Sequence, residues 1–184
     1  QLATSSDSAT LPESLFFIKL AEKRFSEMRA KPYLKGTTVN EAIGHNEIYE
    51  DIEEACKKNK IDLIVMGSSG ASGFKEMFIG SNTEKVVRTS KIPVLVIKNN
   101  HEQFNVTDFV FATDFSEEGR GALDKAQKFA KKLGAKMHLL FVNTPGDFKT
   151  SVQAQNIMEN FVSGMGVENY TLNIYNDTSV EKGI

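Results

Sequence analysis

Apolar residues follow two alternating patterns along this chain. In one, they recur every three or four residues, as at Leu15, Ile18, Ala21 and Phe25, which is typical of an amphipathic helix. In the other, they form short runs such as residues 61–66, which are apolar without interruption from Leu63 to Met66 and are typical of strands buried on both faces of a parallel sheet.

In chain order, these patterns predict a helix at 11–31, a mixed strand-like segment at 37–43, a helix at about 48–60, a strand at 61–66, a helix at 81–90, a strand at 93–97, a polar linker, a strand at 108–113, a helix at 116–133, a strand at 137–142, a helix at 152–162 and a strand at 170–175. Gly134 is the expected C-terminal cap of the helix at 116–133. Helices that alternate with strands predict an α/β fold with an open, doubly wound parallel sheet that has helices on both faces.

The composition is ordinary for a soluble chain, with 40% hydrophobic and 25% charged residues among 184. It excludes a disordered tail, a collagen-like fibre and a disulfide-stapled miniprotein. The net charge of −2 favours neither nucleic acid nor an acidic membrane as a partner, and no apolar run approaches the ~20 residues of a membrane span.

The single cysteine, Cys56, cannot form an internal disulfide and lies on an apolar helix face, so we expect a core position and a cytoplasmic location. Because the sequence starts at Gln1 and not at Met, it leaves open whether a leader peptide has been removed.

A weak internal repeat bears on the domain organisation. Residues 37–52 and 171–184 each show a strand pattern, a small turn and a pair of apolar residues four apart. The pair begins at Ile48 in the first copy and at Val180 in the second, 132 residues later, which is about one domain length.

Two interpretations of this repeat remain open. In one, the chain spans a junction between two copies of a domain, with the later part of the first copy in residues 1–98, a linker in 99–107 and the earlier part of the second copy in 108–184. In the other, the similarity only reflects the fact that all helix–strand units resemble one another at this level.

A glycine-rich loop between a buried strand and a helix is the segment most suggestive of chemistry. It includes Gly67, Gly70 and Gly80, and it follows the carboxyl end of a strand, where open parallel sheets bind ligands. Ser81 and Glu84 have the S-x-x-E spacing of a capping box, and a helix start suits a phosphate because it presents free N–H groups. The alternative is an ordinary surface loop. Neither the P-loop sequence nor G-x-G-x-x-G occurs in the chain.

The spacing of this loop, Gly67-x2-Gly70-x9-Gly80-Ser81, resembles the nucleotide motif of ATP-binding universal stress proteins. The flanking segments DLIVMG at 62–67 and PVLVI at 93–97 resemble the same family, and FATDFS at 111–116 and LLFV at 139–142 resemble its opening strands. The resemblance covers nearly the whole chain after residue 10. It implies the Rossmann-like or flavodoxin-like fold of these proteins.

The resemblance also implies a role for each residue of the loop motif. Gly67, Gly70, Gly80 and Ser81 would hold the triphosphate of ATP, either alone or with Mg²⁺, and Asn82 would donate its backbone N–H. No residue is implied to be catalytic or to bind a metal directly.

Four further residues would surround the nucleoside. The resemblance implies that Asp114 holds the adenine or ribose, that Ala112 and Val142 line the adenine pocket, and that Met66 packs nearby. For Asp114 the alternative is a cap on the helix that begins near Ser116. Met66 and Val142 are core residues on the ordinary interpretation of a strand.

The chain departs from the family pattern in two ways. Ser69 stands where members often carry histidine, and Ala71 and Ser72 stand where a basic residue is common. The glycine loop also precedes the aspartate-bearing strand, so each copy of the domain would be incomplete. The two halves could complement each other within one chain or between chains as a strand-swapped dimer, or the chain could belong to a larger tandem protein.

The resemblance favours a cytoplasmic universal stress protein that binds ATP as a sensor or regulator of the stress response. The partners implied are an adenine nucleotide and a second copy, as a homodimer or a tandem pseudo-dimer. One alternative is a member without nucleotide that acts through dimerisation and protein contacts. Another is a slow ATPase or autokinase, with Ser81 as the phosphorylation site.

Overall fold

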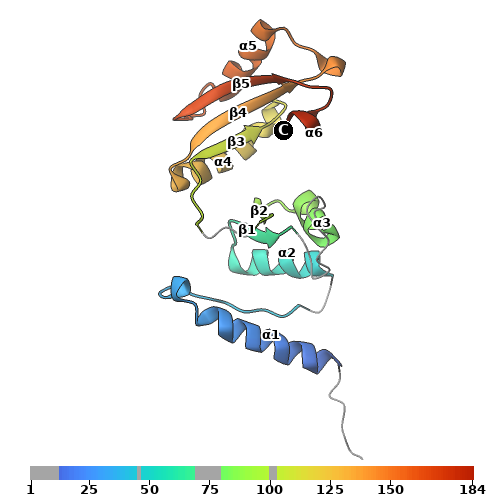
Figure 1. Ribbon diagram of the computed structural model, residues 1–184, viewed down its shortest axis with the longest axis vertical. Coiled ribbons are helices and arrows are strands. Elements are labelled where there is room, and N and C mark those ends of the chain that lie inside the picture. The colour runs from blue at the N-terminus through green and yellow to red at the C-terminus, as the bar shows by residue number, and fades with distance from the viewer. Residues whose placement is uncertain (1–12, 45–46, 69–79, 100–102) are drawn as a thin grey trace, which may run out of the picture. The chain divides into compact units, whose positions relative to one another are not determined.

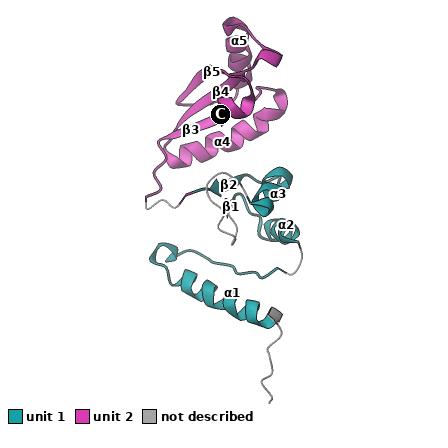
Figure 2. Ribbon diagram, turned by 45° about the vertical axis from the view of Figure 1, so that its right-hand side comes forward, with its two compact units in different colours: residues 1–98 teal, residues 99–184 magenta. Residues whose placement is uncertain are grey.

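The computed structural model describes residues 13–44, 47–68, 80–99 and 103–184 (Figure 1). The chain divides into two compact units, which Figure 2 shows in different colours. Unit 1 spans Gln1–Lys98 and unit 2 spans Asn99–Ile184. Each unit contains its own parallel sheet.

Unit 1 has a two-stranded sheet in which β1 and β2 pair in parallel, from Ile64 opposite Val94 to Gly67 opposite Ile97. Its elements are α1 (Glu13–Arg29), the 3-10 turn η1 (Pro32–Leu34), α2 (Ile48–Asn59), β1 (Ile64–Gly67), α3 (Ser81–Thr89) and β2 (Val94–Ile97). Side chains from α2, α3 and one face of the sheet form a small core around three buried residues, Cys56, Ile64 and Val86. The expected core position of Cys56 is therefore confirmed.

Two predictions for unit 1 are wrong. The segment 37–43 is not a strand, because no strand among the described residues pairs with it. The run at 61–66 becomes a strand only from Ile64, and it is buried on one face alone, since Val65 is 59% exposed on the other. The described helices of this unit that pack on β1 cover the face of Ile64 and Met66, which leaves the face of Val65 open.

Unit 2 has a three-stranded parallel sheet in the order β3-β4-β5. Its elements are β3 (Asp108–Ala112), the 3-10 turn η2 (Glu117–Gly119), α4 (Arg120–Leu133), β4 (Lys136–Asn143), the 3-10 turn η3 (Pro145–Asp147), α5 (Ser151–Val162), β5 (Tyr170–Asn176) and α6 (Val180–Gly183). These match the predicted alternation, and Gly134 caps α4 in the left-handed conformation, as expected.

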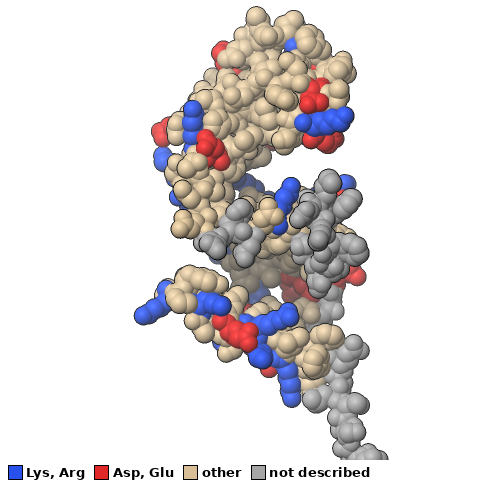
Figure 3. Space-filling view, viewed as in Figure 1, with Lys and Arg blue, Asp and Glu red and all other residues tan. Residues whose placement is uncertain are grey.

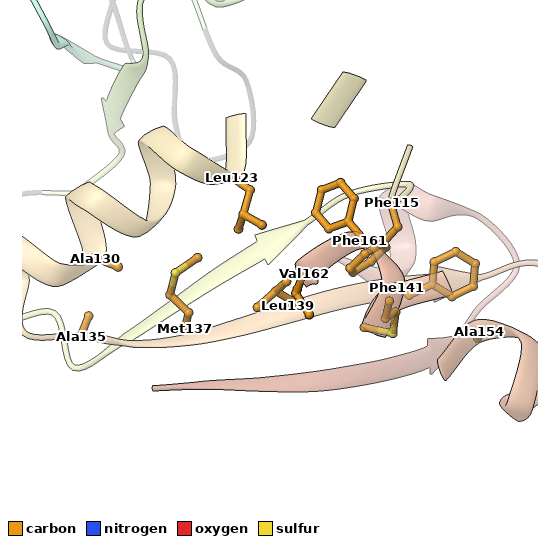
Figure 4. Packing of buried hydrophobic residues seen from close by; sticks show 11 residues of the cluster. Phe115, Leu123, Ala130, Ala135, Met137, Leu139, Phe141, Ala154, Phe161 and Val162 are labelled. Atoms are coloured by element: carbon orange, nitrogen blue, oxygen red, sulfur yellow. The ribbon is translucent and has the colours of Figure 1, made fainter. Parts of the chain in front are cut away.

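Helices α4 and α5 pack on the same face of this sheet, as right-handed crossovers require when the strands are added in one direction. Leu123 of α4, Leu139 of β4 and Met158 of α5 are fully buried there. Phe115 stands edge to face against Phe161, with ring centroids 5.1 Å apart (Figure 4). This cluster is the main core of the chain.

The opposite face of the sheet carries a chain of hydrogen bonds across all three strands. His138 on β4 is bonded through Nε2 to Asp108 Oδ1 of β3 and through Nδ1 to Thr171 Oγ1 of β5, each at 2.8 Å. Asn173 donates to Thr171 Oγ1 at 3.0 Å. Because Asp108 accepts a hydrogen bond from His138, the pKa of its carboxyl is lowered. His138 therefore has a structural role, because it links β3 and β5.

Toward the carboxyl ends of the strands, the same face becomes apolar. Val142 alternates with Phe141 along β4 and so lies on the face opposite the core. Gly183 of α6 approaches it so closely that an added Cβ would lie 2.4 Å from Val142 Cγ1. The α6 turn thus begins to cover this second face, and the prediction of helices on both faces is confirmed for unit 2.

The surface charges of unit 2 agree with the small net charge. On the face drawn in Figure 3, acidic and basic side chains lie beside each other and are separated by uncharged areas. None of the helices that the structure describes is both long enough and apolar enough to cross a membrane.

Met158→Ala is expected to destabilise unit 2 by about 2–5 kcal/mol, because it leaves a cavity among fully buried side chains. Val152→Ala is the matched control, since Val152 lies in the same helix but is 70% exposed, and its effect should stay within about 0.5 kcal/mol. Urea unfolding followed by circular dichroism measures both. Equal effects of the two changes would contradict the assignment of the core.

Asp108→Asn should change how stability depends on pH. Folding favours the ionised carboxyl, so its contribution is present above the unfolded pKa of about 4 and disappears as the pH falls through the lower pKa of the folded chain. The variant should therefore be less stable than the unaltered chain at neutral pH and converge with it in acid. Glu118→Gln, at an exposed position of η2, is the control. A difference that stays constant in urea midpoints from neutral to acid pH would refute the prediction.

Candidate functional site

In unit 1, a buried threonine fixes the start of α3 to the carboxyl end of β1. Thr83 is only 5% exposed, and its Oγ1 donates a 2.9 Å hydrogen bond to the carbonyl oxygen of Gly67. The backbone N–H of Gly80 donates to the carbonyl oxygen of Ser68 at 2.7 Å. Ser68 and Gly80 therefore lie next to each other. The first turn of the helix lies directly beyond the strand end.

The predicted capping box at Ser81 and Glu84 is wrong. The helix begins one residue earlier than that motif needs, so Gly80 is the N-cap and has no side chain to offer. Ser81 is the first helical residue, and the Glu84 carboxylate instead forms a 3.0 Å ion pair with Arg88. The N–H groups of Ser81, Asn82 and Thr83 have no acceptor within the helix, because the first intrahelical bond runs from Glu84 N to Gly80 O. Among the described residues, the helix start thus presents backbone N–H groups that no side chain caps.

The remaining loop residues are placed as follows. Met66 packs against the small core of unit 1, as its strand position suggested, and Gly67 is the exposed last residue of β1. Gly80 has a φ of −58°, so its backbone does not require glycine. Gly70 lies outside the described residues.

In unit 2, Asp114 is exposed immediately beyond the carboxyl end of β3. Its Oδ1 accepts a 3.0 Å hydrogen bond from the backbone N–H of Ser116 and a 3.4 Å bond from Thr113 Oγ1. Chiefly because of the bond from the Ser116 backbone, the pKa of the Asp114 carboxyl is lowered, so it is ionised at neutral pH. Asp114 thus forms a turn before η2 and is not itself the N-cap of a helix. Neither bond uses Oδ2.

A strained turn holds Asp114 in this exposed place. Phe115 has a φ of +60°, which is rare for a bulky residue and costs about 1–3 kcal/mol. Burial of its ring against Phe141 and Phe161 offsets this cost. The turn sends successive side chains in opposite directions, so that Phe115 enters the core and Asp114 faces solvent.

Ala112 and Val142 lie on the same apolar part of the sheet, near the strand ends. Both are half-buried. Ala112 pairs with Leu140 of β4, and Val142 lies two residues further along that strand, on the same face. Tyr175, which pairs with Val142, is 54% exposed on that face. Together with Asp114, these side chains form a small apolar surface bordered by a carboxylate.

Sequence reasoning missed Asn143, a buried and hydrogen-bonded polar group at this edge. It is 4% exposed, and its Nδ2 donates to the Lys149 carbonyl and to Asn176 Oδ1, both at 3.0 Å. Its Oδ1 accepts from Lys149 N at 2.8 Å. It therefore fixes the loop after β4 to the end of β5. An asparagine that ends a hydrophobic strand just before Pro145 was the available signal.

The predicted site residues thus fall into two groups, each in its own unit. Unit 1 brings together the residues at the β1–α3 junction: Met66, Gly67, Gly80, Ser81 and Asn82. Unit 2 brings together the residues at the ends of β3 and β4: Ala112, Asp114 and Val142. Within the described ranges, no three His, Cys, Asp or Glu side chains are grouped as a metal site would need.

Parallel strands joined by crossover helices, with glycine and aspartate turns at the strand ends, define a doubly wound α/β protein of the Rossmann-like class. The model of the universal stress protein family matches residues 2–98, more than half of the chain. The chain belongs to the universal stress protein family.

Curated relatives agree with this assignment. A universal stress protein of Methanocaldococcus jannaschii is 42% identical over 62 residues, which are 34% of this chain and 34% of the relative. Universal stress protein YxiE of Bacillus subtilis is 34% identical over 76 residues, 41% of this chain and 51% of the relative. The chain therefore spans between a third and a half of the length of these relatives.

Solved structures support the fold. A universal stress protein from Archaeoglobus fulgidus matches 90% of this chain and 59% of its own, with 28% identity and a TM-score of 0.63. A putative universal stress protein from Pseudomonas aeruginosa matches 91% of this chain and 60% of its own, with 16% identity and a TM-score of 0.58. The second likeness concerns the fold alone.

Thr83→Val should loosen the start of α3, because it removes the bond to Gly67 and leaves that carbonyl without its buried donor. We expect a loss of about 1 kcal/mol or more in unfolding free energy, and faster hydrogen exchange of the β1 and α3 amides. Thr89→Val is the control, since its Oγ1 bonds only the exposed Lys85 carbonyl of the same helix. Equal exchange rates in the two variants would contradict the assigned role.

Proposed function

We propose that this chain is part of a universal stress protein that binds ATP and acts as a sensor or regulator in the stress response. The observation that carries the proposal is the junction at which Thr83 ties α3 to the end of β1. That junction positions the N–H groups of Ser81 and Asn82, which have no acceptor within the helix, beside the carboxyl end of a parallel strand. Such an arrangement favours a phosphate through hydrogen bonds and the positive potential of the helix start.

The absence of a capping side chain strengthens the phosphate assignment. With glycine at the N-cap, residue 80 has no side-chain oxygen that could compete for the N–H groups of the first turn. A triphosphate would supply the missing acceptors, and Gly67 and Gly80 would let it approach the backbone. Gly70 belongs to the same proposal through the spacing of the motif.

The end of β3 in unit 2 suits a nucleoside. The ionised Asp114 has Oδ2 available to accept hydrogen bonds from ribose hydroxyls. Ala112 and Val142 provide an apolar surface for a base, and Tyr175 on the same face could stack on it. Mg²⁺, if it accompanies the triphosphate, would be held largely by phosphate oxygens and water.

The domain organisation is part of the proposal. We propose that residues 1–98 are the later part of one universal stress protein domain and residues 108–184 the earlier part of a second. Two observations support this organisation: α2 and α6 begin at Ile48 and Val180, 132 residues apart, and the two compact units divide between Lys98 and Asn99. Each unit would then hold one half of a nucleotide site.

A homodimer, a tandem pseudo-dimer or a strand-swapped dimer would each complete these half-sites. The exposed Val65 and Val110, at 59% and 57%, support a partner for the sheets, because parallel sheets are ordinarily covered on both faces. A cytoplasmic location belongs to the same proposal and rests on the single unpaired cysteine.

Isothermal titration with ATP, together with analysis of nucleotide released from the denatured protein, tests the proposal. Gly80→Val should weaken ATP binding about tenfold or more, because a branched side chain would stand over the first-turn N–H groups.

Asp114→Asn should weaken ATP binding by a similar factor, because it removes the charge from the proposed hydrogen bond to ribose, and a charge-assisted hydrogen bond contributes about 1.5–3 kcal/mol. Asp147→Asn, in η3 of unit 2, is the control and should leave affinity unchanged.

Two outcomes would contradict the proposal. Failure to recover nucleotide or to bind added ATP would favour a member that works through dimerisation and protein contacts. Unchanged affinity in Gly80→Val would remove the loop from the site. Conversion of bound ATP to ADP, or mass addition of phosphate at the exposed Ser81, would shift the assignment toward a slow ATPase or autokinase.

A further inference from the structure

Three polar side chains of unit 2 are arranged as a carboxylate, an imidazole and a hydroxyl on the sheet face opposite the main core. They are Asp108 of β3, His138 of β4 and Thr171 of β5, on three adjacent strands (Figure 1). His138 Nε2 lies 2.8 Å from Asp108 Oδ1, and His138 Nδ1 lies 2.8 Å from Thr171 Oγ1. This is the geometry of a nucleophile, a general base and a group that orients the base.

The chemistry of the partners fixes the direction of each hydrogen bond. An ionised carboxylate can only accept, so in neutral His138 the proton is on Nε2, and Nδ1 is the acceptor. The hydroxyl of Thr171 must then donate to Nδ1. Asn173 Nδ2 donates to Thr171 Oγ1 at 3.0 Å and uses one of its lone pairs, which leaves the hydroxyl proton for His138. The proton of Thr171 therefore points at a base.

Asn173 also places an amide donor beside the hydroxyl. Its Nδ2 bonds the carbonyl oxygens of Leu139 and Thr171 at 3.3 and 3.4 Å, and because carbonyls only accept, the NH₂ group must face Thr171. The oxyanion that forms when Oγ1 attacks a carbonyl carbon would lie within reach of this donor. One side-chain donor stabilises an oxyanion less than the paired backbone donors of serine proteases do, so this arrangement suits esters with a good leaving group.

A small substrate can reach these groups. The side chain of Asp108 is 62% exposed and that of His138 is 28% exposed, while Thr171 and Asn173 are half-buried. None of the four is among the residues of the proposed nucleotide site. The inference drawn from them is therefore independent of ATP binding.

We propose that Thr171 is a nucleophile that accepts the acyl group of small activated carboxylic esters, such as aryl acetates, with His138 as its general base. Thr171 Oγ1 bonds the acyl carbon, its hydroxyl proton passes to His138 Nδ1, and the bond to the aryl oxygen breaks. The imidazolium faces the Asp108 carboxylate and gives the proton to the departing aryl oxygen. Water then attacks the acyl carbon and gives a proton to Nδ1, which returns it to Thr171 Oγ1 as the carboxylic acid leaves.

The probe for this reaction is p-nitrophenyl acetate. The burst of p-nitrophenolate gives the acylation rate, and intact mass followed by peptide mapping locates the acetyl group. We expect one acetyl group on the peptide that contains Thr171. Neutral hydroxylamine should remove it, because it is bound as an ester, whereas acetyl groups on lysine would stay. Acetyl groups found on lysines alone would overturn the proposal.

Substitutions at two threonines of unit 2 form a matched pair. Thr171→Val removes the hydroxyl at nearly constant size and should lower the acylation rate about a hundredfold, while Thr171→Ser should retain it. Thr178→Val is the control, because the Oγ1 of this exposed threonine bonds Asp177 and not an imidazole, so the rate should be unchanged. Equal acylation rates in Thr171→Val and Thr178→Val would refute the assignment of the nucleophile.

His138→Gln distinguishes a base from a nucleophile. We expect it to lower the acylation rate about a hundredfold, as the loss of a general base does. If His138→Gln abolishes the reaction but Thr171→Val does not, the imidazole attacks the ester itself and the proposal is wrong. Urea midpoints of all variants show whether each one remains folded under the assay conditions, and Thr171→Ser preserves the hydrogen bonds that link the strands.

Asp108 is a positioning residue, because it acts through His138. Asp108→Asn should lower the saturating acylation rate about tenfold or more and leave the ester concentration at half-saturation unchanged, since it removes the charge beside the imidazolium and no substrate contact. A role limited to holding the strands together would leave the acylation rate of the folded variant unchanged, which would contradict this part of the proposal.

Discussion

The parallel direction of the strands is the constraint on which the rest of this structure depends. In each sheet all strands run the same way, so their carboxyl ends meet at one edge. Each connection must then cross back over a face of the sheet. The turns that follow the strand ends therefore lie at one edge, where their polar groups are not part of the apolar core. Gly67, Asp114 and Asn143 all lie at such ends. The proposed chemistry of both units follows from this one arrangement.

Packing and site geometry are coupled at these strand ends. In unit 1, the buried hydroxyl of Thr83 fixes a helix start against the last residue of β1. In unit 2, the Phe115 ring is held in the core although its backbone is strained, and that strain leaves Asp114 outside. In both places a side chain that does not itself contact the proposed ligand determines where the contacting groups lie. Changes in the core are therefore expected to alter the proposed site as well as stability.

Elements with a clear period were predictable from the sequence. The helical spacing of apolar residues such as Ala126, Ala130 and Leu133 identified α4, and Gly134 identified its end, because the left-handed cap needs no side chain. Continuous apolar runs identified the strands, and their alternation with helices identified the fold class. The family resemblance rested on the spacing of glycines, which is local in the chain. Local signals of this kind do not depend on which segments pair in space.

The failures concern properties that depend on partners distant in sequence. Residues 37–43 have strand-like composition, but none of the described strands pairs with them. Val65 is 59% exposed because the described helices pack on the other face of β1, so the pattern alone misjudged both. A shift of one residue in the helix start made Gly80 the cap in place of Ser81. The left-handed backbone of Phe115 was hidden because burial, and not local preference, holds it there.

The central claim is that the first turn of α3 binds the phosphates of a nucleotide. Amide chemical shifts of Ser81, Asn82 and Thr83, recorded during titration with ATP and separately with adenosine, test it most directly. The account predicts that ATP shifts these three amide resonances and that adenosine, which lacks phosphate, leaves them in place. ATP binding that perturbs other residues but not the start of α3 would contradict the account.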